Sequence, residues 1–270
     1  MKTIVITGSS SGIGKATAKH FAAQGWQVAA TMRKPEKETE LNQIDNISLY
    51  ALDVTDEASI AKATEQILDD FGTVDVVINN AGYGLAGPFE AASPEQIKRQ
   101  FDTNLFGLMG VTRAFLPNFR ANKAGLFMNV SSIGGRITYP FFSLYHSSKW
   151  AVEGFSESLA YELGELGIQV KLIEPGGVDT DFGGRSMEFA MNEELSAHNE
   201  ALGQVQAKFR NSGLGRSTAE YQAEKIFEAA TDGKTQMRYL IGDDAVQTYG
   251  MRAQVGDDAF IAGMKERMFS

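Results

Sequence analysis

The chain has 270 residues, and its 25 lysines and arginines against 34 aspartates and glutamates give it a formal net charge of −9. This acidic balance argues against binding to a nucleic-acid backbone, while 43% hydrophobic and 22% charged residues are typical of an ordered globular protein. The absence of cysteine excludes disulfides, thiolate catalysis and cysteine-bound metals. Because the sequence has neither a run of about 18 apolar residues nor a signal-peptide pattern, and its histidines are dispersed, we expect a cytoplasmic protein that binds no membrane, nucleic acid or metal.

Strands and helices are predicted to alternate along the chain. Short apolar, β-branched runs predict strands over residues 3–7, 27–31, 47–52, 74–78, 125–130, 169–173 and 237–241. Helical patterns lie between these runs, and Ser93 before Pro94, like Ser217 three residues before Glu220, predicts the start of a helix. Because parallel strands need crossover connections, the alternation predicts an α/β fold: a single doubly wound, Rossmann-like domain over residues 1–270, with a parallel sheet of about seven strands flanked by helices.

Residues 180–215 depart from this alternation. They contain no strand pattern and are rich in Gly, Met, Asn and Gln. Connecting segments of this kind often carry binding residues or close over an active site. We therefore expect mobile helices that form a lid over the substrate.

A glycine-rich turn, with Gly8, Gly12 and Gly14, follows the first predicted strand and precedes a helix. Backbone N–H groups and the helix dipole at such a place can bind a pyrophosphate, because glycine lets the phosphate approach the backbone. The spacing differs from Gly-x-Gly-x-x-Gly, and Ile13 and Ala16 stand where a P-loop needs Gly and Ser or Thr. By itself this turn is also compatible with a structural bend that binds nothing.

Tyr145 and Lys149 are four residues apart, so they project from the same face of a helix. A free phenol has a pKa near 10, and a neighbouring ammonium lowers that value toward the range useful for proton transfer. Most Tyr and Lys pairs at this spacing are ordinary surface residues. Here, however, Ser131 and Ser132 end the preceding strand at the carboxyl edge of the sheet, where doubly wound folds bind ligands.

Taken together, these residues resemble the short-chain dehydrogenase/reductase family over nearly the whole chain. The matching motifs stand in the family's order and spacing. They are Thr7-Gly8-x3-Gly12-Ile13-Gly14, Asn79-Asn80-Ala81-Gly82, Asn104, Ser132 thirteen residues before Tyr145, Lys149, and Pro175-Gly176-x-Val178-x-Thr180.

Within the family, the chain resembles NADP-dependent carbonyl reductases and ketoreductases. The resemblance implies an oxidoreductase that transfers a hydride between NADP(H) and a carbonyl compound or its alcohol. It implies that Tyr145 is the acid and base, that Lys149 lowers the tyrosine pKa and holds the nicotinamide ribose, and that Ser132 hydrogen-bonds the carbonyl oxygen. Asn104 would hold a water that links Lys149 to solvent. His146 is not expected to be the general base, because neighbouring residues of a helix point apart.

The resemblance also implies a set of cofactor-binding residues. NAD-preferring members carry an acidic residue at the end of the second strand, where this chain has Met32. Arg33 can offer its guanidinium to the 2′-phosphate of NADP(H), with Lys34 as a helper or as a solvated neighbour. The full set is Gly8, Ser10, Gly12, Ile13, Gly14, Arg33, Asp53, Val54, Asn80, Ala81, Tyr145, Lys149, Pro175, Val178 and Thr180.

The substrate is expected to be a hydrophobic ketone or aldehyde, or its alcohol, bound by Ser132, Tyr145, Tyr83, Phe141 and Phe182. Because Arg185 is a cation within the predicted lid, a substrate that carries a carboxylate or a phosphate is the alternative.

Two other functions remain possible for this fold, namely a non-catalytic NADP-binding regulator and an epimerase or dehydratase. By resemblance, the protein forms a homodimer or homotetramer through the helices that carry Asn104 and Tyr145.

Overall fold

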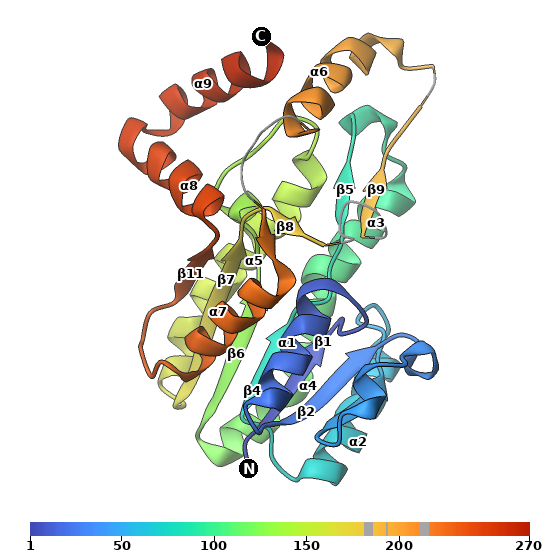
Figure 1. The fold of residues 1–270 in the computed structure, drawn as a ribbon, viewed down its shortest axis with the longest axis vertical. Coiled ribbons are helices and arrows are strands. Elements are labelled where there is room, and N and C mark those ends of the chain that lie inside the picture. Colours follow the sequence, from blue (N-terminus) through green and yellow to red (C-terminus); the bar gives the residue numbers. More distant parts are fainter. Residues whose placement is uncertain (181–185, 193, 211–215) are drawn as a thin grey trace.

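Seven parallel strands form the centre of the molecule in the computed structural model, which describes residues 1–180, 186–192, 194–210 and 216–270 (Figure 1). Their order across the sheet is β11-β7-β6-β4-β1-β2-β3, which confirms the predicted doubly wound α/β fold. The strands are β1 (Thr3–Thr7), β2 (Gln27–Met32), β3 (Ile47–Ala51), β4 (Val76–Asn79), β6 (Gly125–Val130), β7 (Ile168–Pro175) and β11 (Arg238–Ile241).

Helices cover both faces of this sheet. Side chains alternate along β1, so that Ile4 and Ile6 pack under α1 and α7, whereas Val5 packs under α2, α4 and α5 on the other face. All three of these side chains are fully buried, which explains the continuous apolar run in the sequence. The helices are α1 (Gly12–Ala23), α2 (Glu57–Phe71), α3 (Pro94–Phe101), α4 (Gly107–Asn122), α5 (Ser143–Gly164), α6 (Asn199–Arg210), α7 (Ala219–Thr231), α8 (Asp243–Val255) and α9 (Asp257–Phe269).

The strand order reverses between β1 and β4, which lie side by side with Ile6 paired to Ile78. To one side of this point the chain continues through β2 and β3, and to the other through β6, β7 and β11. The connections that leave the two strands therefore separate at their carboxyl ends and open a crevice there. This crevice is where the sequence placed the glycine turn and the residues after β4.

Two predicted helix starts have different outcomes. Ser93 caps α3 as expected, with its hydroxyl accepting from the Gln96 amide and the Gln96 side chain returning to the Ser93 amide. The prediction for Ser217 is wrong by one residue, because Thr218 caps α7 and accepts from the Tyr221 amide. Ser217 instead belongs to a two-residue strand, β10 (Ser217–Thr218), which pairs with β8 (Val178–Asp179).

A second small core lies beyond the carboxyl ends of the strands, where α6, α8 and α9 gather in Figure 1. Val205, Ala245, Phe260 and Met264 are buried there against Ile137, from the loop that precedes α5. The region also corrects one prediction, since the segment expected to contain no strand forms β9 (Met187–Phe189). This strand pairs in parallel with β5 (Gly84–Ala86), and three residues are too few to produce a visible periodicity.

The longest helix of the described residues is α5, and neither it nor any other helix found there has the length and apolar character needed to cross a bilayer.

Candidate active site

A cavity of about 1020 Å³ opens at the carboxyl ends of β1, β4, β6 and β7. One end, which we call the glycine-turn end, is lined by the turn before α1 together with Arg33 and Asp53. The other, which we call the α6 end, is lined by Phe141, Phe142 and side chains of β9 and α6. All fifteen predicted cofactor residues lie in its wall, from Gly8 to Thr180, and so do Ser132, Tyr83 and Phe141 from the predicted substrate set. Phe182 and Arg185 lie outside the described residues.

The glycine turn is fixed to the end of β4 by hydrogen bonds. The Thr7 hydroxyl accepts from the amides of Asn80 and Ala81, both at 3.0 Å, and the Asn80 side chain donates to the carbonyl oxygens of Thr7 and Gly8. A Cβ on Gly14 would lie 2.4 Å from Asn80 Nδ2 and 2.5 Å from the Gly8 oxygen. Only glycine therefore allows α1 to begin so close to the strands, where its first amides face the cavity.

The residues at the end of β2 that line the cavity are Met32 and Arg33, so this part of the wall has a positive charge and no carboxylate. Met32 is buried in the wall, and Arg33 is exposed at the rim. Lys34 follows Arg33 but does not line the cavity. On the neighbouring segment, the Asp53 carboxylate accepts from the amide and hydroxyl of Thr55 at 3.0 and 2.7 Å. The donors of the glycine turn and the Arg33 cation fit a dinucleotide with an additional phosphate.

Ser132, Tyr145 and Lys149 come together where β6 ends against α5. The hydroxyls of Tyr145 and Ser132 share a hydrogen bond, and Ser132 Oγ also accepts from the Gly134 amide at 3.0 Å. Lys149 Nζ donates to the Val130 carbonyl at 2.9 Å and lies 5.9 Å from the centre of the Tyr145 ring. The spacing of four residues thus places the amine and the phenol on the same side of the helix.

Burial determines how these groups titrate. It raises the pKa of Tyr145, and the hydrogen bond from Ser132 only partly opposes that rise. Burial also lowers the pKa of Lys149 to about 8, against the attraction of Glu153. The expectation that Lys149 lowers the tyrosine pKa stays a prediction, because burial and the hydrogen bond with Ser132 are the causes that act on the Tyr145 pKa here.

His146 is buried beside Tyr145, and burial lowers its pKa to about 4. Its Nδ1 accepts from the Tyr139 amide at 3.4 Å, and its ring packs against those of Tyr139 and Phe142. The side chain is absent from the cavity wall. This position agrees with the expectation that His146 is not the general base.

Asn104 lies behind the cavity wall, within a π-helical turn over Asp102–Phe106. Its side chain accepts from the Tyr83 amide at 3.0 Å and donates to the Tyr83 carbonyl and to Ser148 Oγ. A Cβ on Gly82 would lie 3.1 Å from Asn104 Oδ1 and 3.7 Å from Lys149 Nζ. Because Gly82 has no side chain, the Asn104 oxygen and the Lys149 amine border the same position, where both could be polar partners of a water.

Phe141 has a left-handed backbone, with φ at 65°, which is rare for an aromatic residue. The Gly87 amide donates to its carbonyl oxygen at 2.8 Å and helps to hold this conformation. Its ring contacts those of His198, before α6, and Phe269, in α9. Strained residues of this kind cluster at binding sites, and Phe141 lines the cavity that Ser132 and Tyr145 also line.

Residues 180–215 were expected to form helices over the substrate, but no residue of α6 itself was predicted to line the site. Leu202, Val205 and Phe209 line the cavity from α6, and their spacing of three and four residues is a helical face visible in the sequence. Arg99 and Glu188 also lie in the wall, and their ion pair at 2.6 Å ties α3 to β9. No local pattern indicates that pair, because its members lie 89 residues apart.

Comparison with known proteins agrees with this geometry. A family model described as short chain dehydrogenase matches residues 2–190. An oxidoreductase of Botryotinia fuckeliana, BOA17, is 39% identical over 254 residues, which cover 93% of this chain and 92% of that protein. A short-chain dehydrogenase from Streptomyces avermitilis has a crystal structure similar to this one, with a TM-score of 0.85 and 32% identity over 98% of this chain and 95% of that one. ElxO, solved with NADP bound, has a TM-score of 0.76 and 28% identity over 91% of this chain and 99% of that one.

The geometry and the comparisons point to the same family. The glycine turn is fixed to the end of β4, Ser132, Tyr145 and Lys149 line one cavity, and the matches cover most of the sequence. The chain belongs to the short-chain dehydrogenase family of oxidoreductases.

Proposed function

We propose that the protein is an NADP(H)-dependent reductase of hydrophobic ketones or aldehydes, which also oxidises the corresponding alcohols. The observation that carries the proposal is the placement of Ser132, Tyr145 and Lys149 in the wall of a cavity whose other end is the glycine turn. A dinucleotide laid along this cavity with its phosphates at the turn has room for a substrate beside the tyrosine. Bound NADPH would supply the hydride.

In the reducing direction, Tyr145 donates its hydroxyl proton to the carbonyl oxygen of the substrate. Its raised pKa keeps it protonated at neutral pH, as a proton donor must be. Ser132, which already shares a hydrogen bond with Tyr145, donates to the same oxygen and stabilises its developing negative charge. Lys149 stabilises the phenolate that remains, and a water in the space beside Gly82 can carry the replacing proton from solvent.

Replacement of Tyr145 tests the acid and base assignment. Tyr145→Phe removes the proton donor, so we expect turnover to fall by about 10²- to 10⁴-fold while NADPH binding is retained. Turnover is followed by nicotinamide absorbance with a panel of ketones, and binding by calorimetry. Tyr221→Phe is the matched control, because Tyr221 lies on α7, outside the cavity wall, with 41% of its surface exposed. Normal turnover in Tyr145→Phe would overturn the assignment, and intact binding without turnover in the wild type would favour the regulator.

We further propose that Arg33 selects NADP(H) over NAD(H). Its exposed guanidinium lies at the rim of the glycine-turn end, with the buried Met32 in place of an acid. ElxO, whose fold is similar, was solved with NADP. A charge-assisted contact is worth about 1.5–3 kcal/mol, so Arg33→Ala should lower the preference for NADPH over NADH by about 10- to 100-fold. Lys34→Ala is the control and should change this ratio little. Equal use of both cofactors by the wild type would contradict the proposal.

The substrate proposal rests on the character of the α6 end. Phe141, Phe142, Leu202, Val205 and Phe209 present apolar surface there, which suits a bulky hydrophobic carbonyl compound. Turnover should therefore rise with the size of the apolar group in a series of ketones. A preference for charged ketones would contradict this.

We also propose self-association through α4 and α5. Phe106, Trp150 and Tyr161 are 57%, 43% and 75% exposed on these helices or the turn before α4, which is unusual for large apolar side chains. Sedimentation of the wild type should show a dimer or tetramer, and Tyr161→Lys should shift it toward the monomer.

A further inference from the structure

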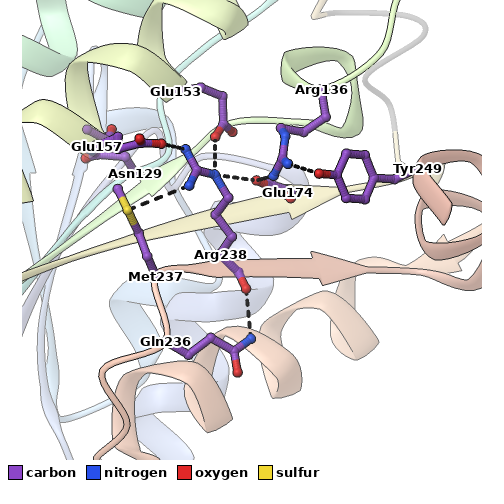
Figure 2. Close-up of polar contacts among 10 residues, drawn as sticks. Asn129, Arg136, Glu153, Glu157, Glu174, Gln236, Met237, Arg238 and Tyr249 are labelled. Carbon is purple, nitrogen blue, oxygen red and sulfur yellow. Dashed lines mark hydrogen bonds and ion pairs between the residues drawn. The ribbon is translucent and has the colours of Figure 1, made fainter. Parts of the chain in front are cut away.

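A cluster of charged side chains lies behind the active site, outside the cavity (Figure 2). It joins helix α5, strands β7 and β11, and the loop that follows Ser132. Tyr249 of α8 closes one side of it. Its charged members are Arg136, Glu153, Glu157, Glu174 and Arg238.

Arg238 is the centre of this cluster. Its Nε lies 3.0 Å from Glu153 Oε2 and 3.5 Å from Glu174 Oε1, and its terminal nitrogen lies 2.5 Å from Glu157 Oε2. Arg136 binds the same oxygen of Glu174 at 3.0 Å and stacks 4.2 Å from the centre of the Tyr249 ring. Figure 2 shows both guanidinium groups directed at the carboxylates between them.

Three members of the cluster are attached to the proposed catalytic machinery. Glu153 follows Lys149 by one helical turn, so that both side chains lie on the same face of α5. Glu174 directly precedes Pro175 in the cavity wall, and Arg136 follows Ser132 by four residues. The loop that carries Arg136 touches α5 closely, since a Cβ on Gly135 would lie 3.0 Å from Glu153 Cγ and 3.2 Å from the Lys149 carbonyl.

The two inner carboxyl groups are almost wholly buried, with 6% of Glu153 and none of Glu174 exposed. In the described part of the chain, Glu153 Oε1 and Glu174 Oε2 have no hydrogen-bond partner. Two buried carboxylates so near to one another repel, and one of them holds a proton more readily. Burial and the charge of Glu153 raise the pKa of Glu174 to about 7. Glu153 Oε2 accepts a charge-assisted hydrogen bond from Arg238 Nε at 3.0 Å, which favours the carboxylate form of Glu153.

The charge on Glu153 bears directly on Lys149. Burial favours the neutral amine, and Glu153 favours the ammonium. In the described residues around Lys149, the charged and titratable groups are Tyr145 and Glu153 on α5, with Arg136, Glu174 and Arg238 behind Glu153. Glu153 is the negative charge among them that shares a helix face with the lysine, and its charge raises the Lys149 pKa against the effect of burial.

We infer that Glu153 is a positioning residue for Lys149. The buried ion cluster around Arg238 keeps Glu153 ionised one turn from the lysine, and this negative charge holds the Lys149 amine as an ammonium at the pH at which the enzyme works. The inference rests on the proposed function, because it gives the ammonium its role beside Tyr145. The inference predicts that residues outside the cavity wall, which contact neither substrate nor cofactor, determine the charge of Lys149.

The direct test is to titrate Lys149 with and without Glu153. Lysine labelled with carbon-13 at Cε reports ionisation by NMR, and the Lys149 signal is identified by its loss in Lys149→Arg. In Glu153→Gln we expect the titration midpoint of Lys149 to fall by about one pH unit, because a nearby opposite charge favours the ammonium and its removal favours the neutral amine. The alkaline limit of kcat/KM for ketone reduction should move to lower pH by a similar amount.

Glu157→Gln is the matched control. It removes a second contact to Arg238 from the same helix but leaves Glu153 in place, so the Lys149 midpoint should stay unchanged. Glu153→Asp, which keeps the charge, should restore much of the wild-type midpoint. If Glu153→Gln does not fold, Glu153→Gln/Arg238→Met removes both charges together and should lower the midpoint in the same direction.

An unchanged Lys149 midpoint in Glu153→Gln, or an equal shift in Glu157→Gln, would overturn the inference. The NMR titration needs no substrate, so it separates this failure from that of the proposed function. A protein that reduces no ketone but shows the expected midpoints would contradict the proposed reaction and leave the link between Glu153 and Lys149 standing.

Discussion

The glycine-turn end of the cavity is formed largely by backbone, whereas the α6 end is formed by side chains from three separate segments. At the first end, Gly14 has no space for a side chain and Thr7 fixes the turn to the residues after β4. At the second, Phe141, β9 and α6 line the cavity, and Phe141 and α6 also pack on a small core of their own, apart from the two layers that cover the sheet. A site formed by backbone atoms requires particular residues, such as glycine, at fixed positions. A site formed by side chains can accept other residues at the positions that line it. We therefore expect the first end to be intolerant of change and the second to determine which substrate binds.

Equal truncations at the two ends give the strongest test of this difference. Ile6 is fully buried in the sheet beneath the glycine turn, so Ile6→Ala should lower the free energy of unfolding by about 4 kcal/mol. Leu202 is 6% exposed in α6 and lines the cavity, so Leu202→Ala should raise KM for bulky ketones with a much smaller loss of global stability. Chemical denaturation and steady-state kinetics measure the two effects. Similar losses of stability in both variants would contradict the distinction.

The pH dependence of stability offers a second test, through His146 beside the α6 end. The folded protein keeps His146 neutral down to about pH 4, whereas the unfolded chain binds a proton near pH 6.5. As the pH falls between these values, His146 should therefore lower the free energy of unfolding by about 3 kcal/mol in total. The measurement is the difference between wild type and His146→Gln in denaturation from pH 7 to pH 4.

Glu174 acts in the opposite direction and must be separated from His146. Burial raises its pKa to about 7, so its contribution to stability is present at low pH and is lost as the pH rises through that value. Both proteins in the comparison contain Glu174, and its contribution cancels in their difference. Parallel curves for wild type and His146→Gln would show that the buried histidine does not control stability in this range.

The smallest expected effect is at the ion pair between Arg99 and Glu188. The two side chains are 52% and 32% exposed, and a pair of this kind contributes less than about 1 kcal/mol. Arg99→Gln should therefore raise KM for ketones by only about two- to fivefold, through looser attachment of β9. Because salt screens exposed charges, the effect should shrink at high ionic strength. A large change in NADPH affinity instead would place Arg99 at the wrong end of the cavity.

The sequence predicted the glycine-turn end well because its determinants are local. Gly8, Gly12 and Gly14 follow a strand and precede a helix, and a backbone site of this kind requires those residues at that spacing. Tyr145 and Lys149 were found for the same reason, since one helical turn fixes their relative positions.

The features that were missed depend on contacts between distant segments. The strands β5 and β9 have three residues each, so they leave no periodic pattern. Glu153 and Arg238 are 85 residues apart, and in the sequence each is indistinguishable from a surface charge. The raised pKa of Tyr145 was also missed, because it results from burial by the folded chain.

The way in which β9 is attached affects how the substrate site can change during evolution. The Gly84 amide donates to the Ser186 carbonyl and the Ala190 amide to the Ala86 carbonyl, both at 2.8 Å, so main-chain atoms secure both ends of the strand. Met187 and Phe189 can then be exchanged for other side chains without releasing the segment from the cavity wall. Selection for a new substrate can act on these two positions at little cost to the architecture that binds the nucleotide.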